Sequence, residues 1–167
     1  AIIGYSEMLQ EEAEDVGDKG YIPDLEKIHG AGRHLLGLIN DVLDLSKIES
    51  GKMTLYLEEF DVAQLVKEVA GTVQPLIVKN GNRLEVDCPS GLGAMYADVT
   101  KVRQTLFNLL SNAGKFTEQG VIRLRTWRDD PDHLHFSVAD NGIGMNSRQV
   151  TRLFQAFTQA DTSTSRK

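Results

Sequence analysis

The stretch from Leu106 to Phe116 restricts the possible folds of this chain most strongly, because its residues fall into two kinds. If it is helical, spacings of three and four residues gather its apolar side chains on one face. These apolar side chains belong to Leu106, Leu109, Leu110 and Ala113, and Val102, one turn earlier, falls on the same face. The same spacings place Asn108, Asn112 and Lys115 on another face. We expect the apolar face to pack into a core. The polar face is either a ligand site or simply the solvent-exposed face of an amphipathic helix.

Two amides and an ammonium group suit a magnesium polyphosphate, because amide oxygens are hard donors and lysine supplies a charge for phosphate. A second stretch, Asp140-Asn-Gly-Ile-Gly-Met145, follows a predicted strand from His133 to Ala139. Period two in this strand places Asp140 on the apolar face of Phe136 and Val138. A carboxylate there needs a donor, and a ligand amine could be one. The alternative is that Asp140 leaves the strand register and caps the following turn.

A helical hairpin is predicted at the start of the chain. A helix from Ala1 to Glu14 and a polar turn from Asp15 to Gly20 lead into a second helix, which begins near Pro23 and ends before Gly51. This second helix carries an apolar stripe that is too wide for one partner helix to cover. The stripe consists of Ile28, Ala31, Leu35, Leu36, Leu38, Ile39, Val42, Leu43, Leu45 and Ile48. We expect two copies to form a four-helix bundle; the alternative is a hairpin that packs only on its own domain.

The remaining residues predict a domain of mixed helices and strands. Asp61 and Gln64 form a capping-box pattern for a helix from Val62 to Lys79, in which Pro75 is expected to cause a kink. Asp98 is expected to cap the helix that contains Asn108 and Asn112. Strands are predicted at Leu84–Asp87, Ala94–Ala97, Val121–Trp127 and His133–Ala139, and a last helix at Ser147–Phe157.

Composition excludes several classes of function. The chain is 41% hydrophobic and 25% charged, and it has no run near the roughly 18 apolar residues of a membrane span. A net charge of −6 without a basic stripe argues against nucleic acid as a partner. The single cysteine, Cys88, excludes an internal disulfide and fits a cytoplasmic location. His133 and His135 have a spacing that could suit a metal, but without a third ligand we expect a polar sheet face.

Four stretches of this chain resemble the sensor histidine kinases of two-component systems. Residues 38–53, from Leu-Ile-Asn-Asp-Val-Leu to Gly-Lys-Met, are similar to the second helix of the kinase dimerisation domain and its exit. Residues 106–116 resemble the N box, residues 140–145 the first glycine box, and residues 153–161 the F box. The resemblance implies an α+β fold with two parts. Residues 1–52 would be the dimerisation hairpin, and residues 53–167 the ATP-binding domain, an incomplete two-layer α/β sandwich.

The resemblance also implies a role for each site residue. Asn112 would hold Mg²⁺, Asn108 would lie beside the phosphates of ATP, and Lys115 would contact them. These three would be the catalytic residues. Asp140 would bind the adenine amino group. The other nucleotide-binding positions that it implies are Phe116, Gly142, Ile143, Gly144, Phe154 and Phe157, with Arg166 in the ATP lid.

The activity implied is transfer of the γ-phosphoryl group of ATP to a histidine, and then to an aspartate of a response-regulator receiver domain. The family's acceptor histidine is expected before Ala1 and its second glycine box after Lys167, since neither His29 nor His34 has the acceptor's sequence context. We therefore expect a piece of a longer kinase, inactive by itself, with any membrane attachment in other segments.

Two other functions remain open. One is an ATPase of the gyrase, Hsp90 or MutL type. Those enzymes carry a glutamate at the place of Asn108, and an amide cannot accept a proton from water, so Asn108 argues against hydrolysis. The other is a module that binds nucleotide and dimerises without catalysis. Intact Asn112, Lys115 and Asp140 argue against such a loss in the parent protein.

Overall fold

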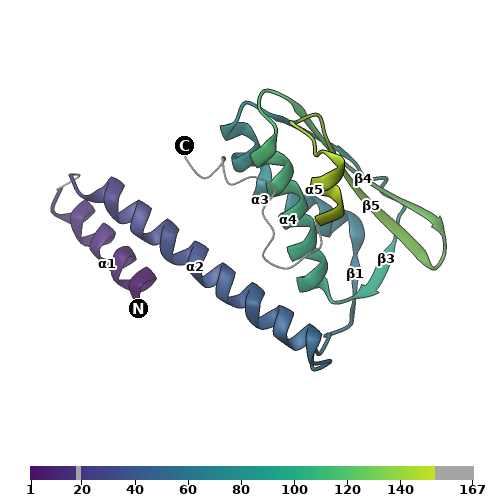
Figure 1. The fold of residues 1–167 in the computed structure, drawn as a ribbon, viewed down its shortest axis with the longest axis horizontal. Coiled ribbons are helices and arrows are strands. Elements are labelled where there is room, and N and C mark those ends of the chain that lie inside the picture. Colours follow the sequence, from purple (N-terminus) through teal and green to yellow (C-terminus); the bar gives the residue numbers. More distant parts are fainter. Residues whose placement is uncertain (18–19, 153–167) are drawn as a thin grey trace. The chain divides into compact units, whose positions relative to one another are not determined.

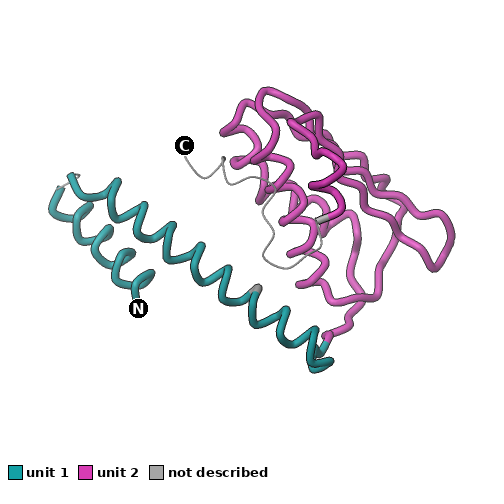
Figure 2. The backbone as a smooth tube through the Cα atoms, in the orientation of Figure 1, with its two compact units in different colours: residues 1–54 teal, residues 55–167 magenta. Residues whose placement is uncertain are grey.

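The structure, a computed structural model, describes residues 1–17 and 20–152. The chain divides into two compact units, Ala1–Thr54 and Leu55–Lys167 (Figure 2). Three predicted site residues, Phe154, Phe157 and Arg166, lie outside the described residues, as does the end of the helix predicted to reach Phe157. Among the described residues, no helix has both the length and the apolar character needed to cross a membrane.

The first unit is a hairpin of α1 (Ile2–Asp15) and α2 (Ile22–Glu49), as predicted (Figure 1). The two helices approach closely at Gly32, where a Cβ atom would lie 3.0 Å from Cγ1 of Ile3. Nε2 of His29 lies 2.8 Å from Oε1 of Glu7, so this histidine links the two helices. The hairpin helix α2 ends at Glu49 with Ser50 as its C-cap, and Gly51 follows with a φ of 66°.

The apolar stripe of α2 remains largely exposed within one chain. α1 has 14 residues against 28 in α2, so it can cover only part of its neighbour. Eight stripe residues are between 45% and 57% exposed: Ile28, Leu35, Leu36, Leu38, Ile39, Val42, Leu43 and Ile48. Among the side chains that the structure describes in this unit, Ser6 alone is buried.

The second unit combines helices with two small sheets. Strands β1 (Glu58–Asp61) and β3 (Ala94–Ala97) pair antiparallel. In the other sheet, β2 (Arg83–Asp87) runs parallel to β4 (Val121–Asp130), which pairs antiparallel with β5 (His133–Asp140). The helices are α3 (Val62–Lys79), α4 (Val99–Phe116) and α5 (Ser147–Arg152). The predicted strand ended at Trp127, whereas β4 extends to Asp130. Oδ1 of Asp130 accepts hydrogen bonds from the amides of Asp132 and His133, so the turn between β4 and β5 is shorter than predicted.

Local capping signals fix where the two long helices of this unit begin. Oδ1 of Asp61 accepts a hydrogen bond from the amide of Gln64, 2.7 Å away. The reciprocal half of the predicted capping box is absent among the described contacts, because Gln64 donates its side-chain amide to Glu68 instead. Asp98 caps α4, and the backbone amides of Tyr56 and Lys101 hold the pKa of Asp98 below its ordinary value. α3 continues through Pro75 to Lys79.

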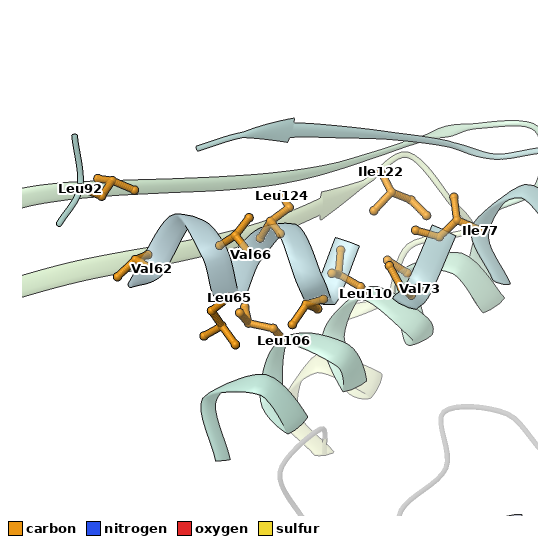
Figure 3. Close-up of a cluster of buried hydrophobic side chains, with 12 residues drawn as sticks. Val62, Leu65, Val66, Val73, Ile77, Leu92, Leu106, Leu110, Ile122 and Leu124 are labelled. Atoms are coloured by element: carbon orange, nitrogen blue, oxygen red, sulfur yellow. The ribbon is translucent and has the colours of Figure 1, made fainter. Parts of the chain in front are cut away.

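One hydrophobic core holds the layers of this unit together. Figure 3 shows side chains of α3, α4 and β4 meeting in it. The contributions of α3 are Val62, Leu65, Val66, Val69, Val73 and Ile77; those of α4 are Leu106, Leu110 and Ala113; those of β4 are Ile122 and Leu124. This core fixes the buried face of α4, and so decides which of its side chains face solvent.

Candidate nucleotide-binding site

The polar face of α4 is free to meet a ligand. Asn108, Asn112 and Lys115 are exposed, while Leu106 and Leu110 on the opposite face are 2% and 0% exposed. The ammonium of Lys115 lies 5.3 Å from the centre of the Phe116 ring. The helix thus presents two amides and one cation along successive turns of one side.

Leu109 corrects the predicted packing face. It is 47% exposed, although its spacing predicted a place on the buried face of α4. Its position on the helix lies between the apolar and polar faces, and α3 packs against α4 from the side of Leu106 and Leu110. Leu109 therefore borders the polar face next to Asn108 and Asn112.

The end of α4 and the end of β5 meet. The hydroxyl of Thr117 donates to Oδ1 of Asp140 over 3.4 Å, and the amide of Ile143 donates to the carbonyl of Phe116 over 3.2 Å. Lys115 and Phe116, at the last turn of α4, therefore lie at the same junction as Asp140. The structure thus joins the two stretches that the sequence analysis singled out, with Asn112 one helical turn before Phe116.

Asp140 keeps its strand register and also caps the following turn. It pairs opposite Ile122 in the β4–β5 ladder, and its Oδ1 accepts a hydrogen bond of 2.9 Å from the amide of Gly142. The side chain is exposed, so the expectation of an apolar setting was wrong: the strand ends here, beyond the core. Every described hydrogen bond to Asp140 reaches Oδ1, which leaves Oδ2 available to a ligand donor.

The two glycines of the loop differ in what they require. A Cβ atom at Gly142 would overlap the carbonyl oxygen of Phe116 and lie 2.7 Å from the hydroxyl of Thr117. At Gly144 there is open space, but its φ of 66° is one that other residues rarely adopt. The loop is held further by Asn141, whose Oδ1 accepts a hydrogen bond from the amide of Val121 over 2.8 Å. Gly142 therefore lets the loop rest directly on the end of α4.

Sequence reasoning missed a buried residue behind this junction. Asn82, 5% exposed, donates from Nδ2 to the carbonyls of Gly114 and Thr117 at 3.2 and 2.6 Å. Its Oδ1 accepts a hydrogen bond of 2.9 Å from the amide of Gly120. No local pattern marks Asn82, because its partners lie more than thirty residues away in the chain. The position after Asn80-Gly81 reads simply as part of a turn.

Two protein families match this chain. Residues 1–51 match the His Kinase A (phospho-acceptor) domain. Residues 97–167 match the family described as histidine kinase-, DNA gyrase B-, and HSP90-like ATPase. The chain is 42% identical over 146 residues to the circadian input-output histidine kinase CikA of Synechococcus elongatus. The aligned region covers 86% of this chain and 19% of that protein. The chain belongs to the sensor histidine kinases.

Solved histidine kinase structures share the fold. Full-length ShkA in complex with AMPPNP matches with a TM-score of 0.71 and 32% identity, over 83% of this chain and 30% of that one. Histidine kinase ThkA in complex with the response regulator TrrA matches with a TM-score of 0.56 and 23% identity, over 95% of this chain and 46% of that one. The predicted fold class, a helical hairpin followed by an α/β ATPase-type domain, is confirmed.

The exposed amide oxygens of α4 would suit a magnesium ion that is bound together with phosphates. Within residues 1–17 and 20–152, no group of three His, Cys, Asp or Glu side chains could hold a metal. His133 pairs with Asp130, and the ring of His135 stacks on Trp127 at 5.0 Å. Mg²⁺ usually keeps several waters and binds through one or two protein oxygens together with substrate phosphates. An exposed amide such as Asn112 supplies such an oxygen.

Proposed function

We propose that this chain provides the dimerisation hairpin and ATP-binding domain of an ATP-dependent protein-histidine kinase. The observation that carries the proposal is the junction at which the C-terminal end of α4, the helix that bears the polar face, meets the loop after β5. Asn108, Asn112 and Lys115 come from the helix, and Asp140 and Gly142 from the loop. One end of the site suits a polyphosphate with its metal, and the other suits an adenine ring.

Each side chain has a part in this proposal. Lys115 binds phosphate as a point charge, and Asn108 orients the phosphates beside it. Asn112 offers a neutral oxygen to Mg²⁺, which when bound neutralises charge on the transferred phosphoryl group. Asp140 accepts a hydrogen bond from the adenine amino group through Oδ2. Ile143, 78% exposed, is an apolar side chain at the adenine end. Catalysis then depends mainly on positioning, as is general for phosphoryl transfer.

Asn108 favours transfer over hydrolysis. A hydrolytic ATPase needs a side chain that accepts a proton from the attacking water, and the amide of Asn108 cannot do this near neutral pH. Of the described residues of α4, the exposed side chains near Asn112 contribute no carboxylate. The phosphoryl group would instead pass to a histidine, and then to the aspartate of a response regulator, the class of partner that TrrA is for ThkA.

The role of Asp140 is tested by nucleotide selectivity. Asp140→Asn should weaken binding of Mg-AMPPNP by about 1–3 kcal/mol, roughly 5- to 150-fold, because the amide would offer a donor or a weaker acceptor to the adenine amino group. Isothermal titration calorimetry with Mg-AMPPNP and Mg-GMPPNP measures the effect. Asp132→Asn, an exposed aspartate in the β4–β5 turn, is the matched control and should bind like wild type.

Two results would count against this role. Equal affinity of the wild-type protein for the adenine and guanine nucleotides would remove the assignment of Asp140. Absence of binding of either nucleotide would overturn the proposed nucleotide function of the chain.

We also propose that the hairpin pairs with a second copy of itself. Eight apolar side chains of α2 are about half exposed in one chain, and α1 is too short to cover them. A contiguous apolar surface of this kind marks an interface. A second hairpin with the same stripe would complete a four-helix bundle with two-fold symmetry.

A charge in the middle of the stripe should break this dimer. Val42→Glu is expected to halve the mass measured by sedimentation equilibrium, because an unpaired carboxylate at a packed interface costs several kcal/mol. Leu76→Glu is the matched control, since Leu76 is an equally exposed apolar residue of α3, at 46% against 45% for Val42. A wild-type protein that is monomeric at all concentrations, or a Val42→Glu variant that remains dimeric, would contradict the proposed interface.

A further inference from the structure

We infer that Asn82 is a positioning residue for the nucleotide site, which it reaches through Thr117. This inference rests on the proposed function. Asn82 lies at the approach to β2, outside every segment that resembles a kinase box, and its side chain does not touch the loop of Asp140 in the described contacts. Its effect on nucleotide must therefore be indirect.

The C-terminal end of α4 depends on hydrogen-bond donors from outside the helix. The last carbonyls of a helix have no partner inside it and need donors from elsewhere. Nδ2 of Asn82 donates to the carbonyls of Gly114 and Thr117, on either side of Lys115 and Phe116. Its Oδ1 binds the amide of Gly120 at the approach to β4. One buried side chain thus fixes both the end of the helix and the turn after it.

The segment that Asn82 fixes is in contact with the loop of Asp140. The hydroxyl of Thr117 donates to Oδ1 of Asp140, and the carbonyl of Phe116 accepts the amide of Ile143. Gly142 lies directly against the same two residues. The segment that Asn82 holds is therefore the surface on which the loop of Asp140 rests. A shift of this segment would move the adenine end of the site.

Asn80 offers a matched control for Asn82. Asn80 also donates its side-chain amide to the carbonyl of Gly114, over 2.9 Å. It is exposed, and its side chain has no described hydrogen bond to Thr117 or Gly120. Removing Asn80 should weaken the end of α4 without releasing Thr117. Removing Asn82 should release both.

The experiment measures binding of Mg-AMPPNP and Mg-GMPPNP by calorimetry. The temperature is one at which circular dichroism shows that each variant is folded. Asn82→Ala should raise the Kd for Mg-AMPPNP about tenfold and that for Mg-GMPPNP much less, so that adenine selectivity shrinks. Asn80→Ala should keep the wild-type selectivity. Val62→Ala, a core truncation at the far end of α3, controls for lower stability alone.

A double-mutant cycle tests the route through Asp140. If Asn82 acts through Asp140, the variant with both Asn82→Ala and Asp140→Asn should bind Mg-AMPPNP no more weakly than the weaker single variant. Additive effects would overturn the inference. So would an Asn82→Ala variant with wild-type selectivity, or one that loses affinity equally for both nucleotides.

A second variant covers the case in which Asn82→Ala does not fold. Thr117→Val keeps the backbone carbonyl that Asn82 binds and removes only the hydroxyl that reaches Asp140. It should show the same loss of adenine selectivity, and unchanged selectivity would overturn the inference. If the wild-type protein binds neither nucleotide, the proposed function fails and this inference with it. If the wild-type protein binds nucleotide and these variants keep its adenine selectivity, the inference fails while the proposed function stands.

Discussion

Asn112→Ala and Asn112→Asp should each reduce Mg-ATP-dependent phosphotransfer by about a hundredfold or more while leaving the dimer intact. Alanine removes the neutral oxygen that we assign to Mg²⁺, and aspartate adds a negative charge beside the phosphates. Asn112 is exposed on the polar face of α4, so neither change disturbs the core. The measurement is acid-labile phosphoryl incorporation by the kinase from labelled ATP, with Mg-AMPPNP binding by this chain as a second readout.

Thr105→Ala is the control for these variants. Thr105 is an exposed polar residue of the same helix, and its hydroxyl donates to the carbonyl of Lys101 within α4. This change should leave phosphotransfer and binding near the wild-type level. Wild-type turnover in Asn112→Ala would show that another group holds the metal.

Gly142→Ala should weaken binding of Mg-AMPPNP by about a hundredfold. Its methyl group would overlap the carbonyl of Phe116 and crowd the hydroxyl of Thr117, so the loop must move away from the end of α4. A displacement of about 1 Å in a positioning element can cost this much. The movement would also break the hydrogen bond from the amide of Ile143 to Phe116. Calorimetric titration measures the affinity, and thermal unfolding measures the accompanying loss of stability.

Gly71→Ala is the matched control, at a glycine where a Cβ atom would meet no other atom. Gly71 is exposed within α3, and a Cβ there would meet nothing within 4 Å. The variant should bind nucleotide normally and be more stable by about 0.5–1 kcal/mol, because alanine is the better helix former. Normal affinity in Gly142→Ala would show that nucleotide binding does not depend on close contact between the loop and the end of α4.

The starts of the two long helices of the second unit could be predicted to the residue because their signals are local. Asp61 and Asp98 cap the helices that begin immediately after them, and each cap bonds an amide three residues away. The exposed side of α4 followed in the same way from the spacing of Asn108, Asn112 and Lys115. Leu109 was misplaced because periodicity alone cannot say how far a neighbouring layer extends around a helix.

The remaining features depend on contacts between distant segments. The setting of Asp140 was wrong because alternation along β5 shows which side a residue takes, but not where the core ends. Asn82 carried no signal, since its three partners are 32 to 38 residues away. The need for glycine at position 142 likewise arises from the carbonyl of Phe116, which no spacing rule identifies. Such contacts become visible only when the chain is folded.

The unequal burial in the two units has a consequence for how the protein assembles. All the fully buried apolar side chains among the described residues belong to the second unit, while the hairpin has none. The second unit therefore has a hydrophobic core of its own, whereas the helices of the hairpin would gain most of their stability from the association that we propose. Dilution should then loosen the hairpin first, so the local concentration of chains governs whether these helices persist.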